Sequence, residues 1–333
     1  MSTQDTVTII GAGAWGTTLA LVAHRAGNSV TLVAHREEVA RILRDHRRHP
    51  SSLPGIVLPE AITIASVDHA DLSGTSVIVL SIPVQQLRSA LAGWHPPIPA
   101  VPIISVAKGL DTVTLQRPTE IIGAALGQHV RLAALSGPNL ASEIAAGQPA
   151  TTLIASTSPG LAERLVPVFH GPAFRVYHGN DVIGLELGGA LKNIIAIGAG
   201  MAEGLGAGDN ARAALMTRGL AEITRLGVAC GASPMTFAGI SGMGDLIATC
   251  ASPLSRNHRV GLGLALGKSL PVILEELGET AEGVPTTLAA RELAHRHGVD
   301  TPIIEQMAGV LFAGTPVATA IDGLLNRRPT NER

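Results

Sequence analysis

The sequence predicts an α/β protein in two parts: a doubly wound domain in residues 1–185 and an all-helical C-terminal domain in residues 186–333. First, strand-like runs rich in β-branched residues alternate with helical periodicity as far as about Gly179. Second, the pattern beyond Gly179 is long helical periodicity without a convincing strand. Third, a chain of 333 residues with 46% apolar residues is long enough for two packed interiors.

Composition excludes several function classes. A net charge of −2 gives no sign of a nucleic-acid or membrane-surface partner. The two cysteines, Cys230 and Cys250, fit no metal or redox spacing, and His295 and His297 lack the partners of a metal site. The N-terminus resembles no export signal, and apolar stretches are interrupted before membrane-spanning length. We therefore expect a cytoplasmic protein with no metal centre and no integral membrane segment.

A glycine-rich turn follows the first expected strand, residues 7–10, and leads into an amphipathic helix. The turn reads Gly-x-Gly-x-x-Gly, with Gly11 allowing a tight turn, Gly13 allowing the backbone to approach a pyrophosphate and Gly16 allowing close helix packing. The amides at the start of the helix then face phosphate oxygens. This context predicts a dinucleotide-binding site, and the alternative is a glycine turn with a structural role only.

The second expected strand, residues 29–34, bears on cofactor choice. It ends at His35-Arg36 instead of the acidic residue that binds an unphosphorylated ribose. Arg36 could pair with a 2′-phosphate, so we expect NADP or NAD as cofactor, with NADPH favoured; the alternative is a solvated arginine. The charged run at 44–49 is interpreted as a surface face without chemistry.

Further strands are expected at residues 61–65, 76–81, 102–107, 130–136, 151–155 and 174–177. The strand at 102–107 delivers Lys108 to the carboxyl edge of the sheet, where ligands of open α/β sheets bind. Lys108 is therefore a candidate contact for cofactor or substrate, although an ordinary loop lysine is the alternative.

In the second half, Lys192 lies among small and aliphatic residues. A buried ammonium loses hydration, so it either finds a partner or releases its proton more readily. Lys192 is therefore the leading candidate for acid/base chemistry, and the alternative is a lysine that reaches the helix surface. Asp245 leaves a glycine-rich turn, from which its carboxylate could reach an ammonium on a neighbouring helix.

The tripeptide Ser255-Arg256-Asn257 combines a hydroxyl, a forked cation and an amide near an expected helix N-terminus. Such a set suits a phosphate monoester. The alternative is a helix cap beside a surface arginine. The last residues, 327–333, are expected to form a frayed tail.

Taken together, these motifs resemble those of the bacterial NAD(P)-dependent glycerol-3-phosphate dehydrogenases over nearly the whole chain. The motifs occur in the family's order: Gly-Ala-Gly-Ala-Trp-Gly-Thr at 11–17, Ala-Lys-Gly at 107–109, Ser-Gly-Pro-Asn-Leu-Ala at 136–141, Leu-Lys-Asn at 191–193, Gly-Asp-Leu at 244–246, Ser-Pro-Leu-Ser-Arg-Asn at 252–257 and Ala-Glu-Gly-Val at 281–284. Each motif alone is modest, whereas their ordered co-occurrence is highly specific.

The resemblance implies a Rossmann-type domain followed by a helical one, with the active site in the cleft between them. It also implies a reversible reduction of dihydroxyacetone phosphate to sn-glycerol 3-phosphate, which supplies glycerophospholipid synthesis, and a homodimer formed through the helical half. Lys192 would transfer the proton, Asp245 would orient its amine, and Lys108 would polarise the carbonyl or hold the phosphate.

By motif position, the resemblance also implies contact residues. Substrate contacts fall on Lys108, Gly137, Asn139, Lys192, Asp245, Ser255, Arg256 and Asn257. Cofactor contacts, besides the three glycines, fall on Ala14, Trp15, His35, Arg36, Lys108, Ala141, Arg256, Thr280 and Glu282. Ala14, Asn139 and Thr280 depart from the commoner family pattern, so Ala14 and Thr280 would contribute only through backbone or packing.

Two other functions are compatible with parts of this pattern. One is a different hydride-transfer enzyme, acting on a hydroxy acid or an acyl thioester, against which the tripeptide at 255–257 suggests a small phosphate ester. The other is a cofactor-binding regulator without catalysis, which would have no need of Lys192 together with Asp245.

Overall fold

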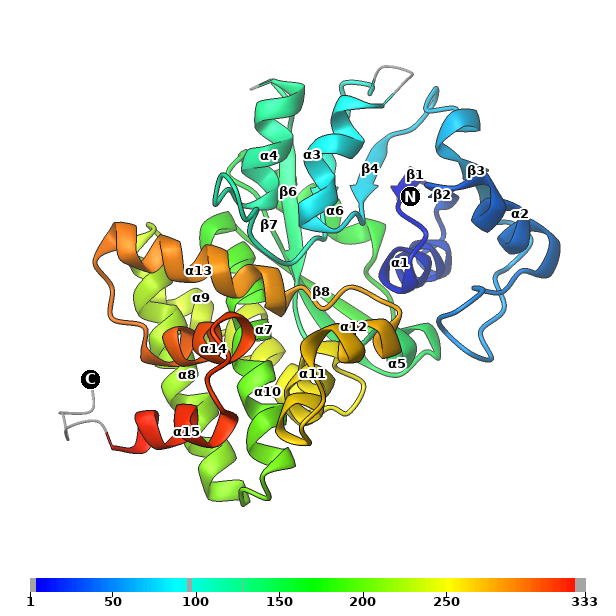
Figure 1. The fold of residues 1–333 in the computed structure, drawn as a ribbon. Helices are drawn as coiled ribbons and strands as arrows, with labels where there is room; N and C mark the ends of the chain where they lie inside the picture. The colour runs from blue at the N-terminus through cyan, green and yellow to red at the C-terminus, as the bar shows by residue number, and fades with distance from the viewer. Residues whose placement is uncertain (1–3, 95–97, 128, 327–333) are drawn as a thin grey trace. The chain divides into compact units, whose positions relative to one another are not determined.

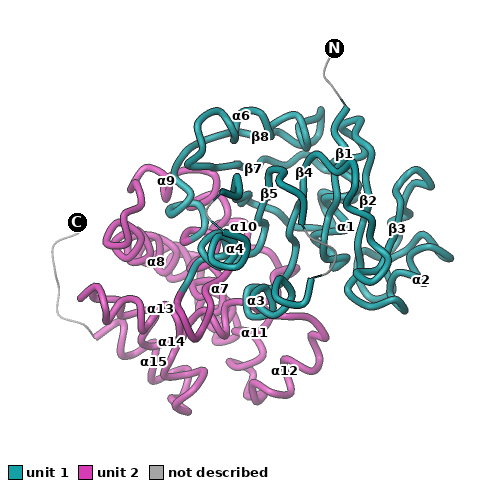
Figure 2. Tube along the Cα trace, turned by 90° about the horizontal axis from the view of Figure 1, so that it is seen from above, with its two compact units in different colours: residues 1–108, 116–186 teal, residues 109–115, 187–333 magenta. Residues whose placement is uncertain are grey.

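The computed structural model describes residues 4–94, 98–127 and 129–326. These residues form two compact units, coloured in Figure 2: unit 1 takes the described residues within 1–108 and 116–186, and unit 2 takes those within 109–115 and 187–333. The short segment 109–115 belongs to unit 2, although the sequence reading assigned it to the first domain. The expected frayed tail at 327–333 lies outside the described residues.

Unit 1 is built on one eight-stranded sheet, which confirms the α/β class (Figure 1). Its strands are β1 (Thr6–Ile10), β2 (Ser29–Ala34), β3 (Thr63–Ser66), β4 (Val77–Leu80), β5 (Ile103–Ser105), β6 (Leu132–Ser136), β7 (Ala150–Ala155) and β8 (Phe174–Gly179). The spatial order is β3-β2-β1-β4-β5-β6-β7-β8. Neighbours pair in parallel except β6 and β7, which are antiparallel.

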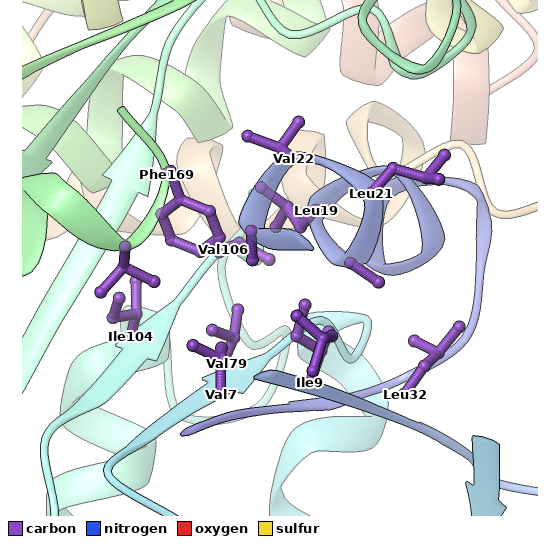
Figure 3. Close-up of a cluster of buried hydrophobic side chains, with 14 of the residues drawn as sticks. Val7, Ile9, Leu19, Leu21, Val22, Leu32, Val79, Ile104, Val106 and Phe169 are labelled. Carbon is purple, nitrogen blue, oxygen red and sulfur yellow. The ribbon is translucent and has the colours of Figure 1, made fainter. Parts of the chain in front are cut away.

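Helices cover both faces of this sheet. They are α1 (Ala14–Arg25), α2 (Glu37–His46), α3 (Val84–Ala92), α4 (Pro118–Leu126), α5 (Ala141–Ala145) and α6 (Leu161–Leu165). Alternate strand residues point to opposite faces. Val79 therefore joins the cluster formed with α1, part of which is drawn in Figure 3, whereas Leu80 joins the cluster formed with α3 and α4. The near-continuous apolar strands follow from burial on both faces.

The glycine turn lies at the point where the strand order reverses. β1 has β2 on one side and β4 on the other. The connection from β1 to β2 and the connection from β4 to β5 therefore run in opposite directions along the sheet. Such a switch point, at the carboxyl ends of the strands, is where open α/β sheets bind their ligands. The turn that follows β1 is therefore in the position that a dinucleotide site requires.

Unit 2 contains helices joined by loops and has no strand among its described residues, as expected. It takes the larger part of α7 (Val182–Gly204) and contains α8 (Asp209–Ala229), α9 (Pro234–Ala238), a π-helical turn (Ile240–Gly244), α10 (Asp245–Ala251), α11 (Arg256–Ala265), α12 (Leu270–Leu277), α13 (Gly283–His297), α14 (Pro302–Phe312) and α15 (Val317–Leu325). The buried carboxylate of Glu222 on α8 accepts hydrogen bonds from the amides of Ile303 and Ile304, so it caps the start of α14.

Helix α7 is long and apolar enough to cross a membrane by length and composition. However, 94% of its most apolar window is buried within the protein. A helix that is apolar on all sides is typical of the interior of a large protein as well as of a membrane span. The burial of α7 therefore makes it a core helix here.

Candidate functional site

The glycine turn of unit 1 is shaped by contacts that leave no room for side chains at two of its three glycines. Gly11 has φ +110°, and a Cβ there would lie 2.2 Å from the carbonyl oxygen of Ser81 at the end of β4. A Cβ at Gly16 would lie 1.9 Å from the carbonyl oxygen of Gly11. Gly13, by contrast, is exposed and has open space where its Cβ would be. A ligand can therefore approach the backbone at Gly13, which fits a pyrophosphate.

The first turn of α1 adds anion-binding groups to this site. The helix begins at Ala14 and Trp15, whose amides have no partners within the helix itself. The first turn contains no acidic residue that would repel a phosphate. The positive end of the helix dipole is therefore available to a negatively charged group.

His35 and Arg36 lie exposed directly after β2. Arg36 is the N-cap of α2, and its side chain is exposed and does not pack in the core. The nearest acidic residue, Glu37, forms an ion pair with Arg44 along the same helix. The end of β2 therefore presents a cation, which suits a 2′-phosphate better than a ribose hydroxyl.

Three more predicted residues of unit 1 lie around the ends of β5 and β6. The ammonium of Lys108 donates to the carbonyl oxygen of Gly137 at 3.0 Å. Asn139 donates to the carbonyl oxygen of Thr151 at 3.4 Å and accepts from the hydroxyl of Thr152 at 3.3 Å, so its amide is held by β7. These contacts gather Lys108, Gly137 and Asn139 at one edge of the sheet.

Ala141 begins α5 and is tied to the helix that follows the glycine turn. Its carbonyl oxygen accepts a hydrogen bond of 3.1 Å from the hydroxyl of Thr18 on α1. The predicted contacts Ala141 and Ala14 thus lie at the starts of two helices joined through Thr18, which also donates to the carbonyl oxygen of Ala14 at 2.8 Å.

Lys192 is buried in unit 2 and carries a buried counter-charge. Only 5% of Lys192 and 1% of Asp245 are exposed, and the Lys192 ammonium donates to Asp245 Oδ1. It also donates to the hydroxyl of Thr249, one turn further along α10. The Thr249 hydroxyl in turn donates to the carbonyl oxygen of Asp245 at 2.6 Å. A lone pair of the Thr249 oxygen therefore faces the Lys192 ammonium. A carboxylate and a hydroxyl oxygen therefore hold the Lys192 nitrogen in place.

Glycines bring α7 and α10 close enough for this pair. A Cβ at Gly188, one turn before Lys192, would lie 2.9 Å from the carbonyl oxygen of Ser241 in the π-helical turn. Within that turn, a Cβ at Gly242 would lie 2.2 Å from the carbonyl oxygen of Phe237. The π-helical turn can therefore pack tightly on α7 and start α10 with Asp245 directed at Lys192. Such turns are frequent at functional sites.

The tripeptide at 255–257 lies at the start of α11. Ser255 is the N-cap, and its hydroxyl accepts from the amide of His258 at 3.3 Å. Asn257 is buried and accepts from the amide of Gly283, the first residue of α13, at 2.9 Å. A Cβ at Gly283 would lie 2.8 Å from the carbonyl oxygen of Asn193, next to Lys192. The starts of α11 and α13 therefore meet the segment of α7 that carries the lysine.

The remaining predicted residues of unit 2 are Arg256 at the start of α11 and two residues, Thr280 and Glu282, in the segment between α12 and α13. Arg256 is nearly half exposed and pairs with Glu279 at 3.3 Å. Thr280 lines an open pocket with Glu279, and Glu282 is the N-cap of α13. The ion pair between Arg256 and Glu279 joins residues 23 positions apart, so no local sequence pattern indicates it.

Three residues near the lysine were missed by sequence reasoning. Thr249 and Cys250 follow Asp245 on α10, and Asn193 follows Lys192 on α7. Thr249 could have been found, since a residue four positions after Asp245 shares its helix face. Burial raises the pKa of the Cys250 thiol to about 12, with Lys192 acting in the opposite direction, so this thiol stays protonated and inert.

The charged run at 44–49 also differs from its interpretation as a solvated face. Residues 44–46 and 48 are exposed, but His49 is half-buried, and its Nε2 lies 2.9 Å from the carbonyl oxygen of Ala12 in the glycine turn. The predicted cofactor residues of unit 1 thus have a neighbour that local sequence periodicity could not reveal.

Comparison with protein families gives two matches that together span most of the chain. Residues 6–162 match the model described as NAD-dependent glycerol-3-phosphate dehydrogenase N-terminus. Residues 181–322 match the model described as NAD-dependent glycerol-3-phosphate dehydrogenase C-terminus. The two matches fall largely on unit 1 and unit 2, respectively.

Individual relatives have the same description. The glycerol-3-phosphate dehydrogenase [NAD(P)+] of Moorella thermoacetica is 45% identical over 330 residues, covering 99% of this chain and 98% of the relative. The crystal structure of glycerol-3-phosphate dehydrogenase from Coxiella burnetii has a TM-score of 0.91 at 35% identity and covers 97% of this chain and 99% of the other. The enzyme of the same name from Saccharomyces cerevisiae has a TM-score of 0.82 at 30% identity, with coverage of 97% and 99%.

Proposed function

Because the chain belongs to the NAD-dependent glycerol-3-phosphate dehydrogenase family, we propose that it reversibly reduces dihydroxyacetone phosphate to sn-glycerol 3-phosphate with NADH or NADPH, and that Lys192 transfers the proton. The observation that carries the role of Lys192 is its burial together with Asp245 and Thr249. A buried lysine that a carboxylate and a hydroxyl hold in one position can deliver a proton from a fixed place, and its burial argues against an ordinary surface role.

The proton transfer follows from the contacts of the lysine. The nicotinamide supplies a hydride to the ketone carbon when the cofactor is bound. As negative charge develops on the substrate oxygen, the Lys192 ammonium donates a proton to it and is left as the neutral amine. In the oxidising direction the neutral amine removes the hydroxyl proton. Asp245 and Thr249 hold the nitrogen in one orientation, so the proton is delivered from a fixed position.

The phosphate of the substrate would be held by the start of α11. Arg256 provides a guanidinium that can form paired hydrogen bonds with phosphate oxygens, and the N-terminal amides of the helix add partial positive charge. Asn257 and Gly283 connect this helix start to α13, and Gly283 packs on the backbone of Asn193. We propose that these contacts keep the phosphate at a set distance from Lys192.

The cofactor would bind unit 1 through the glycine turn. This proposal is supported by the exposed backbone at Gly13, the switch-point position of the turn and the cation at Arg36. In this proposal unit 1 is the dinucleotide-binding domain and unit 2 the substrate-binding domain. We further propose that Lys108 and Asn139 contact the substrate or cofactor, and that Thr280 and Glu282 contact the cofactor.

The cellular setting is proposed from the same family membership. A buried α7 leaves no clear membrane span among the described residues. We propose a cytoplasmic homodimer that supplies glycerophospholipid synthesis. Analytical ultracentrifugation of the purified protein would test the dimer directly. A single species with the mass of one chain would contradict it.

One assay tests the proposed activity. The purified protein is mixed with NADPH or NADH and with dihydroxyacetone phosphate, a 2-keto acid or an acyl thioester, and cofactor oxidation is followed at 340 nm. Rapid oxidation with dihydroxyacetone phosphate alone is expected. Activity restricted to a keto acid or a thioester would indicate another hydride-transfer enzyme, and cofactor binding without any turnover would indicate a regulator.

A further inference from the structure

The loop after α2 contacts the carbonyl side of the glycine turn through one histidine. His49 Nε2 lies 2.9 Å from the carbonyl oxygen of Ala12, which is 37 residues earlier in the chain. On the other side of the ring, Nδ1 accepts hydrogen bonds from the amides of Ser51 at 3.3 Å and Ser52 at 2.9 Å. Because an acceptor nitrogen carries no proton in the neutral ring, the proton of the imidazole is on Nε2, and His49 donates to Ala12.

The loop that presents His49 is itself held in place. The guanidinium of Arg47 donates to the carbonyl oxygen of Ile62 at 2.8 Å, and the carbonyl oxygen of Arg47 accepts from the amide of Leu58 at 2.8 Å. Leu53 and Leu58 are buried in the cluster of hydrophobic residues that also contains α1. The histidine is therefore a fixed donor on a braced segment, not a surface side chain that reaches the turn by chance.

The contact with Ala12 has a consequence for the next residue. The carbonyl of Ala12 and the amide of Gly13 belong to the same planar peptide unit, in which the C=O and N–H bonds point in opposite directions. Anchoring the oxygen at His49 therefore aims the Gly13 N–H away from His49. Gly13 is the exposed glycine whose backbone a ligand can approach.

The neighbouring peptide units of the turn are held by other contacts. The Gly11 amide donates to the carbonyl oxygen of Val33 at 2.9 Å, and the carbonyl oxygen of Gly13 accepts from the amide of Thr17 at 2.9 Å. The peptide between Ala12 and Gly13 lies between these two units, and His49 is the side chain that orients it. Because glycine gives this segment wide backbone freedom, an external anchor has a large effect on where the amide points.

We infer that His49 is a positioning residue for the dinucleotide, which orients the Gly13 amide toward the pyrophosphate through the Ala12 carbonyl. The inference rests on the proposed binding of the cofactor at the glycine turn. His49 would touch neither the cofactor nor the substrate. Its contribution is to keep one hydrogen-bond donor pre-aimed, so that binding does not have to order the turn.

The test compares three variants of the full-length protein. His49→Ala removes both hydrogen-bonding nitrogens. His49→Gln places an amide nitrogen at about the position of Nε2, so the hydrogen bond to Ala12 is retained. Arg48→Ala removes a positive charge from the neighbouring exposed residue and serves as the matched control. The NADPH dissociation constant is measured by fluorescence titration, and the KM for dihydroxyacetone phosphate and kcat are measured at saturating NADPH.

The expected result is specific to the cofactor. His49→Ala weakens NADPH binding about three- to tenfold, the effect of losing one net hydrogen bond. His49→Gln and Arg48→Ala stay within twofold of the parent, and the KM for dihydroxyacetone phosphate and kcat are unchanged in all three. Parental NADPH affinity in His49→Ala, or equal weakening in His49→Gln or Arg48→Ala, would overturn the inference. A parent protein that binds neither NADPH nor NADH would instead overturn the proposed function.

Discussion

The crossing of α7 and α11 sets the distance between Lys192, the proposed proton donor, and the proposed phosphate site, and a single added methyl group tests the importance of this distance. A Cβ at Gly261 on α11 would lie 1.8 Å from the carbonyl oxygen of Ile197 on α7. From the other helix, a Cβ at Gly200 would lie 1.9 Å from the carbonyl oxygen of His258. The two backbones are thus in direct contact at two points, within a few turns of both Lys192 and Ser255.

The size of the expected displacement follows from these distances. An ordinary carbon–oxygen contact needs about 3.5 Å, so relieving the 1.8 Å contact in Gly261→Ala requires the helices to move apart by about 1.7 Å. Overpacking of this kind costs roughly 1–3 kcal/mol of unfolding free energy. A displacement of about 1 Å at a catalytic site can lower the rate by about a hundredfold. We therefore expect Gly261→Ala to lower kcat/KM for dihydroxyacetone phosphate by about two orders of magnitude.

The assay separates this effect from general damage. NADPH binding is expected to weaken far less than kcat/KM, because the glycine turn, where the pyrophosphate is proposed to bind, belongs to unit 1. Gly200→Ala should reproduce the loss from the opposite helix. Gly208→Ala is the matched control, since its Cβ would enter open space before α8. A folded Gly261→Ala protein with kcat/KM within threefold of the parent would refute the reasoning.

Three further predictions concern other parts of the molecule. Arg36→Ala should weaken NADPH binding at least tenfold and leave NADH binding nearly unchanged, because only NADPH carries the 2′-phosphate; equal effects on the two cofactors in parallel titrations would contradict this role. Burial raises the pKa of Glu222 to about 7, against the opposing effect of the amides of Ile303 and Ile304, whereas the unfolded value is 4.5. The stabilising contribution of Glu222 is therefore complete below pH 4.5 and is lost as the pH rises through 7. Over this range, thermal melts should show the unfolding free energy of the parent falling by about 3 kcal/mol relative to that of Glu222→Gln. A difference between the two proteins that does not change with pH would contradict this prediction. Finally, iodoacetamide at pH 8 should label Cys230 at least tenfold faster than Cys250, whose thiol is buried and protonated; mass spectrometry showing equal rates would mean that α10 opens readily.

The sequence was sufficient for features that depend on local pattern. Runs of β-branched residues between turns identified all eight strands, with boundaries within a few residues of those observed. The change to helical periodicity after Gly179 matches the end of β8. The glycine turn could be recognised because its spacing of Gly-x-Gly-x-x-Gly lies within six residues, and the steric demand at Gly16 arises inside the turn itself, from the carbonyl oxygen of Gly11.

Features that depend on contacts between distant segments could not be predicted in this way. The antiparallel direction of β7 depends on how the chain returns to the sheet, and strand composition does not encode it. The assignment of segment 109–115 to unit 2 likewise follows from tertiary packing. His49 contacts a partner 37 residues away, so no local period reveals it. Lys192 was an exception, because a lysine among small apolar residues is itself unusual.

The proton-donor role of Lys192 is tested most directly by Lys192→Ala, measured beside Lys268→Ala, which removes an exposed lysine that pairs with Glu276. NADPH affinity is measured first, to establish that the cofactor site is intact, and the turnover of dihydroxyacetone phosphate is measured at saturating cofactor. We expect Lys192→Ala to bind NADPH within twofold of the parent and to lose about two to four orders of magnitude in kcat, whereas Lys268→Ala keeps parental turnover. A Lys192→Ala enzyme that turns over dihydroxyacetone phosphate at a rate near that of the parent would contradict the account.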